Sequence, residues 1–265
     1  MLIVNLKKHI LLPVYIVVLF SGIHSASGQR MKLNHLTTFD DKLLHFGFTL
    51  GINTFDFGIR NYVPIGLNPD FKEEFWQLDN RQIGANDTVM ADLASPIPGF
   101  TVGIITNLRL TNSLDLRFLP GMSFGERELT YNIPVVDNLF DYAETRYTYS
   151  IKSTYIDLPL QVKYKANRIN NGRPYIMAGT AMRIDISKTA SEDLVGLTPV
   201  GFYAEVGAGW DYYFQFFRFS VEAKASFGLN NQLGNSPGTA DQRHYYADAI
   251  RSLHSRIFTL CFHFE

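Results

Sequence analysis

The chain has 265 residues, of which 46% are hydrophobic, 14% aromatic and 18% charged, and its formal net charge is −1. This balance lacks the basic excess of a nucleic-acid-binding protein, and the hydrophobic fraction is too high for a disordered chain. The single cysteine, Cys261, excludes an internal disulfide framework and a multi-cysteine zinc site.

Residues 1–28 have the three parts of a secretory signal peptide. A basic start at Lys7 and Lys8 precedes an apolar run of 11 residues, Ile10 to Phe20, and small residues follow up to Gly28. The alternative is a membrane anchor, but the run is shorter than the ~20 residues that a spanning helix needs. We therefore expect an exported protein with a short, polar periplasmic segment over residues 29–43 and a β-barrel domain over residues 44–265.

Eight segments alternate between apolar and polar residues with a period of two, which is the pattern of strands with two different faces. They cover residues 44–53, 100–109, 114–125, 156–165, 175–186, 200–212, 217–228 and 258–265. Segments of about ten residues match the ~9–11 residues of a tilted transmembrane strand, and bacterial single-chain barrels have an even number of strands.

Alternation by itself does not distinguish a soluble barrel from a membrane barrel, so the connections between the segments matter. Short connections near 110–112, 166–172 and 215–216 alternate with long ones near 58–98, 126–146, 187–199 and 230–252. This order is typical of an outer-membrane barrel with short periplasmic turns and long external loops. We predict an all-β fold, an eight-stranded antiparallel up-and-down transmembrane β-barrel in the cell outer membrane, in contact with its lipid.

Aromatic side chains gather at the predicted periplasmic ends of several strands, where they would form an interfacial girdle. The girdle candidates are Tyr164, Trp210, Tyr212, Phe214, Phe217, Phe219, Phe262 and Phe264.

The polar face of the strands carries nearly equal numbers of acids and bases. The ion-pair candidates of the lumen are Asp115, Arg117, Asp157, Lys163, Arg183, Asp185, Glu205, Asp211, Arg218, Glu222 and Lys224. Eight strands enclose a space just wide enough for side chains, and a buried charge is costly unless it is paired. We expect a filled, ion-paired interior; the alternative is a charged path for protons or solutes.

No spacing in the chain matches a nucleophile elbow, a zinc-binding helix or a phosphate loop. The sequence therefore assigns no catalytic, cofactor-binding or metal-binding residue, and no small-molecule substrate is identified. A rim-active hydrolase built from His254, Ser255 and an acid is a less favoured alternative. In the first long connection, Phe71, Phe75, Trp76 and Leu78 could form one face of a short helix that caps the barrel.

Several stretches resemble the PorT family of outer-membrane barrels from Bacteroidetes. These stretches are residues 43–53, 116–127, 155–165 and 174–179, with the His-Phe-Gly-Phe strand and Arg-Phe-Leu-Pro-Gly as the narrowest matches. The resemblance implies an accessory role in the type IX secretion system, which exports proteins and supports gliding motility in some relatives. It implies other secretion components as partners, no enzymatic activity and no cofactor. The alternative is a generic small barrel that binds or passes a small ligand.

Overall fold

The computed structural model describes residues 33–71, 77–78, 81–82, 84–93, 96–136, 142–187, 195–234 and 248–265. The signal peptide expected over residues 1–28 lies outside these residues. The chain divides into two units, Met1–Leu33 and Asn34–Glu265, and the second carries the elements described below. Among the described residues there is no helical segment that could span a bilayer.

Antiparallel strands dominate the second unit. In chain order they are β1 (Leu44–Asn61), β2 (Gln77–Leu78), β3 (Arg81–Gln82), β4 (Met90–Leu93), β5 (Pro98–Arg109), β6 (Leu114–Phe118), β7 (Gly121–Val136), β8 (Tyr142–Lys165), β9 (Gly172–Asp185), β10 (Val200–Tyr213), β11 (Arg218–Gly228) and β12 (Ile250–Phe264). Two short 3-10 helices accompany them, η1 (Phe39–Asp41) and η2 (Ile65–Leu67).

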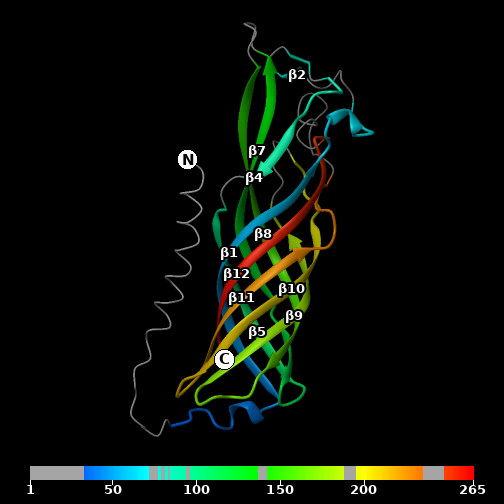
Figure 1. The fold of residues 1–265 in the computed structure, drawn as a ribbon. Coiled ribbons are helices and arrows are strands. Elements are labelled where there is room, and N and C mark those ends of the chain that lie inside the picture. Colours follow the sequence, from blue (N-terminus) through cyan, green and yellow to red (C-terminus); the bar gives the residue numbers. More distant parts are fainter. Residues whose placement is uncertain are drawn as a thin grey trace, which may run out of the picture. The chain divides into compact units, whose positions relative to one another are not determined.

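The strands close into a ring. The order β1-β12-β11-β10-β9-β8-β6-β5 returns to the start through the pairing of β1 with β5. β6 and β7 act as one wall position, because both pair with β5 and with β8 and only Leu119 and Pro120 separate them. The ring therefore has eight positions, which confirms the predicted up-and-down antiparallel barrel (Figure 1).

One end of the barrel carries the tight connections, and we call it the short-turn end. β5 joins β6 through residues 110–113, β8 joins β9 through 166–171, and β10 joins β11 through 214–217. In the second of these, Ile169 and Gly172 exchange two backbone hydrogen bonds around Asn170, whose φ is 54°. Asparagine tolerates this left-handed conformation better than most residues. The opposite end is the long-connection end.

The strands extend further at the long-connection end than the sequence pattern predicts. Residues 126–146, expected to be a loop, contain most of a β-hairpin, because β7 and β8 stay paired up to Val136 and Tyr142. The prediction of a short helix that includes Phe71 and Leu78 is also wrong at Leu78. This residue lies in strand β2 and pairs with Arg81. Phe75 and Trp76 lie outside the described residues.

The β7–β8 hairpin projects beyond the barrel, and β4 lies along it (Figure 1). β4 pairs with β7 between Met90↔Asn132 and Leu93↔Leu129. A buried apolar cluster fills the base of this extension. Its members are Phe57, Ile65, Val89, Ala91, Leu129, Tyr131, Ile151, Val195, Ala249, Ile250 and Leu253. The extension therefore has its own core, which continues the inner face of the barrel past the end of the lumen.

Candidate functional site

The two faces of the wall differ in the sense of a membrane protein. On β10, Val206 is 50% exposed and Phe202 is 53% exposed, whereas the intervening Glu205 is 1% exposed. The same alternation holds on β12, where Phe258 points outward and Thr259 points inward. A soluble barrel would place the apolar residues inside, so the exposed apolar face identifies the surface that lipid covers.

Three ion pairs lie in the lumen near the short-turn end. Arg117 Nη1 lies 2.8 Å from Glu222 Oε2, and Lys163 Nζ lies 2.8 Å from Asp211 Oδ1. Toward the turns, Lys165 Nζ lies 2.6 Å from Asp115 Oδ1. All six side chains are buried, so each charge has the partner that burial demands.

Glu222, Cys261 and His263 bring three potential metal ligands within 4.8 Å of one another. Arg117 Nη2 approaches His263 Nε2 at 3.0 Å while its other amino group binds Glu222. Since guanidinium is a donor only, Nε2 of His263 accepts and the ring proton belongs on Nδ1. The cation that these residues hold is therefore the guanidinium of Arg117, and we assign no metal to the cluster.

A second network crosses the middle of the lumen. Arg183 bridges two acids, with Nε 3.0 Å from Asp157 and Nη2 2.9 Å from Glu205. Glu205 also accepts hydrogen bonds from Gln161 at 2.7 Å and Ser226 at 2.8 Å. Lys224 Nζ lies 3.5 Å from the same carboxylate. Shared partners of this kind hold several strands in one register.

Arg127, on β7, closes the lumen toward the long-connection end. Its guanidinium donates to the hydroxyls of Ser153 at 3.2 Å, Tyr155 at 3.1 Å and Ser255 at 2.9 Å. The same group lies over the rings of Phe55, Phe57 and Tyr155, with the nearest centroid at 4.3 Å. Cation–π attraction and neutral hydroxyls thus solvate a charge that is 1% exposed. The sequence pattern ends this strand at 125 and so does not indicate Arg127, although the inward series Gly121, Ser123 and Gly125 points to it.

The short-turn end is covered by the segment before β1. The carboxylate of Asp40, in η1, accepts a hydrogen bond from Tyr213 at 2.8 Å and lies 3.2 Å from Arg173 Nη1. Phe39 stacks on His45 with ring centroids 4.2 Å apart. The only sequence signal at Asp40 was a polar segment ahead of the first strand, so its role could not be predicted.

Glu265 completes this end of the lumen by pairing with Arg218 at 2.5 Å. Burial by itself would raise the pKa of Glu265, but the positive charges of Arg218, Lys163 and Arg117 lower it below its usual value. Phe264 points outward beside it and packs on Phe48, with ring centroids 4.8 Å apart.

The structure brings the predicted lumen residues together, except for Asp185. Asp185 stands at the end of β9, where it accepts a hydrogen bond from the backbone N–H of Ser187 at 2.9 Å; it forms none of the ion pairs seen in the described part of the chain. Lys224 is half-buried, and the others are buried.

The girdle candidates lie on the outer face near the short-turn end. Trp210 is 40% exposed and Tyr164 54% exposed. Phe219 stacks on Phe262 with centroids 6.3 Å apart, and Phe214 lies 5.2 Å from Phe217. The remaining candidates, Tyr212 and Phe264, flank these pairs through contacts with Trp210 and with Phe217 and Phe219.

The residues of the hydrolase alternative do not meet. Neighbours along a strand point to opposite faces, so His254 is on the outer face of β12 and Ser255 on the inner face. Ser255 is bound to Arg127, as described above. His45 is stacked on Phe39, and Asp41 lies 3.9 Å from Arg109. This geometry places no nucleophile beside a base at these positions.

Charged side chains leave little free space in the described lumen. Arg117 and Lys163 have no solvent-accessible surface, and Asp211 has none either. A water-filled channel past these residues would leave part of each accessible. Within the described residues, the interior of the barrel is therefore a polar core of ion pairs.

The comparison with known protein families agrees with this architecture. Over residues 28–234 the chain matches the family described as outer membrane protein beta-barrel domain. No curated protein matches it.

Two solved structures are similar to it, both from Pseudomonas aeruginosa. The N-terminal β-barrel domain of OprF is 14% identical, with 81% of this chain and 96% of that chain covered and a TM-score of 0.32. OprG is 10% identical, with 84% and 93% covered and a TM-score of 0.38. With TM-scores this low, neither similarity is evidence for the fold. The fold is established by the closed ring of strands. From the family match and that ring, the chain belongs to the outer membrane protein beta-barrel family, and its place is the outer membrane.

Proposed function

We propose that this barrel is a non-enzymatic accessory protein of type IX secretion. The observation that carries the proposal is the filled lumen: the described ion pairs leave no passage beside Arg117 and Lys163, so the barrel acts through its surfaces. The resemblance of residues 43–53, 116–127 and 155–165 to the PorT family supports the choice of secretion system.

The two ends of the barrel also support a role that depends on the protein's surfaces. The extension of β4, β7 and β8 offers a folded surface outside the membrane, with a buried apolar core at its base. At the short-turn end, η1 covers the mouth through Asp40. These are the surfaces that other secretion components would contact, one on each side of the membrane.

Deletion of the gene tests the proposal. We expect type IX cargo to accumulate inside the cell, and a wild-type copy to restore export. Normal export of that cargo in the deletion strain would refute the secretory role. The control is a copy with Lys163→Met and Asp211→Leu, which replaces both members of a buried ion pair by apolar residues. If the protein acts through its outer surfaces, this copy should restore export as well as the wild-type copy does.

Conductance in planar lipid bilayers tests the closed lumen separately. The purified barrel should give no steady open-channel current. A stable current with the wild-type protein would favour the alternative of a barrel that passes a small ligand.

A further inference from the structure

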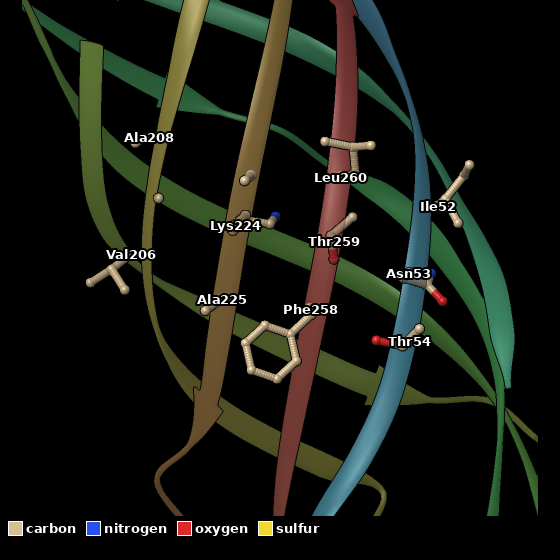
Figure 2. A pocket seen from close by; sticks show the side chains of 12 residues that line it. Ile52, Asn53, Thr54, Val206, Ala208, Lys224, Ala225, Phe258, Thr259 and Leu260 are labelled. Carbon is tan, nitrogen blue, oxygen red and sulfur yellow. The ribbon is translucent and has the colours of Figure 1, made fainter. Parts of the chain in front are cut away.

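A groove of about 700 Å³ runs along the outer face of the wall from β10 across β11 and β12 to β1. Figure 2 shows the side chains of Val206, Ala208, Ala225, Phe258, Leu260 and Ile52 on these four neighbouring strands. All six are outward positions of the lipid-facing series, so the groove opens toward the bilayer.

The groove exists because small residues on two strands face large ones on the next two. Ala208 is paired with Ala223, and Val206 with Ala225, which makes a shallow floor across β10 and β11. Across the next strand, Phe258 pairs with Ala225 and Leu260 with Ala223. Ile52 on β1 stands opposite Leu260 and closes the far side.

A cation stands at the end of the groove that faces the long connections. Arg256 is exposed and lies two residues beyond Phe258 on β12. Its guanidinium leans over Gly58, where an added Cβ would come within 2.9 Å of Nη2. Asp56 is its cross-strand neighbour, yet within the described residues Arg256 takes part in no ion pair. It is an exposed positive charge at the edge of the apolar band.

The spacing of the two features matches one leaflet. Four residues separate Arg256 from Leu260, which is about 13 Å along the strand at ~3.3 Å per residue and about 10 Å along the membrane normal at a tilt of ~40°. The outward apolar band of such barrels is ~25 Å tall, so one leaflet takes about 12 Å of it. Since the long connections of such barrels are external, Arg256 lies at the outer headgroup level and Leu260 lies near the middle of the bilayer.

We propose that the groove and Arg256 form a binding site for one phosphorylated glycolipid of the outer leaflet. An acyl chain lies on the alanine floor between Val206 and Phe258, and a phosphate of the headgroup contacts the guanidinium of Arg256. Guanidinium suits this contact because its paired donors match phosphate oxygens. The proposal needs the barrel to be in the outer membrane and does not depend on its role in secretion.

The test is native mass spectrometry of the full chain in detergent, titrated with diphosphoryl lipid A or with its dephosphorylated form. We expect one tightly held lipid A molecule per barrel and clearly weaker retention of the dephosphorylated form. Arg256→Gln should weaken lipid A binding about fivefold, the effect of one basic residue at a charged interface, and leave the dephosphorylated form unaffected.

Ala225→Phe fills the floor of the groove and should abolish tight retention of both lipids. Val162→Phe, on the lipid-facing side of β8 across the ring, is the matched control and should bind as the wild type does. Heat-modifiable migration on gels verifies that each variant is folded.

Equal retention of the two lipids, or wild-type binding by Arg256→Gln, would overturn the phosphate contact and the proposal with it. Wild-type lipid binding by Ala225→Phe would also overturn the proposal. The groove would then be assigned to a transmembrane segment of a partner protein. If Ala225→Phe does not fold, the Arg256→Gln variant still tests the proposal. Residue 256 lies beyond the apolar band, so we expect this variant to fold.

Discussion

Removing the carboxylate of Glu222 should destabilise the barrel strongly. Its Oε2 accepts from Arg117 at 2.8 Å and from the hydroxyl of Tyr175 at 2.9 Å, and the side chain is 1% exposed. Glu222→Ala leaves a buried guanidinium without a carboxylate, for which about 3–5 kcal/mol of unfolding free energy is typical. The unpaired hydroxyl of Tyr175 adds to that loss.

The double variant Arg117→Met/Glu222→Leu is the informative control. It removes both charges and keeps most of the volume, and replacement of a buried pair by apolar residues is often near neutral or even stabilising. We therefore expect the double variant to be more stable than Glu222→Ala, although it has lost more of the wild-type contacts.

Reversible urea unfolding of the barrel in lipid vesicles measures both variants. Tryptophan fluorescence, to which the lipid-facing Trp210 contributes, reports the transition, and gel migration with and without heating provides a second probe. A loss of less than about 1 kcal/mol in Glu222→Ala, the scale of an exposed pair, would refute the description of this lumen as a buried, paired core.

Other substitutions address the remaining parts of the molecule. Val206→Arg places a charge on the lipid-facing wall and should cost about 2–4 kcal/mol in the same urea assay, whereas Ser150→Arg on the projecting hairpin should be neutral; equal effects would contradict the membrane boundary. Leu129→Ala opens a cavity in the apolar cluster and should cost about 2–5 kcal/mol of local stability. Limited proteolysis should then cut the hairpin while the barrel stays intact, and unchanged resistance would argue against that core. Asp40→Asn weakens the contact with Arg173, so hydrogen exchange of residues 34–42 should quicken without a change in the barrel; unchanged exchange would mean that Asp40 does not hold the segment.

The sequence predicted the barrel well because the bilayer acts locally on each strand. An even-numbered residue of β10, such as Phe202 or Val206, is apolar because it contacts lipid. Its neighbour Glu205 faces the lumen and can therefore be polar. The pattern fails where lipid ends. Beyond residue 125 the alternation of β7 reverses: the inner positions Leu129 and Tyr131 are apolar, whereas the outer positions Glu126 and Glu128 are polar. The pattern of a lipid-facing strand is lost there, so the sequence predicts a loop where the structure has a hairpin.

The partners within the lumen could not be predicted in the same way. Periodicity places Arg117 and Glu222 on the inner face of separate strands, 105 positions apart in the chain, without indicating that they meet. Their contact depends on the tilt and stagger of the strands, which closure of the ring fixes. The same holds for Arg127, which the ring surrounds with aromatic groups, and for Asp40, which reaches the mouth from outside the strand pattern.

The local pattern of residues is thus enough to predict which side chains face lipid and which face inward, since that choice depends on each residue's own surroundings. The pairing of the inward charges, the covering of the two ends and the groove where small residues on β10 and β11 meet large ones on β12 come from the fold. Each of these depends on the register between strands, and a register is a relation between distant segments that no single segment encodes.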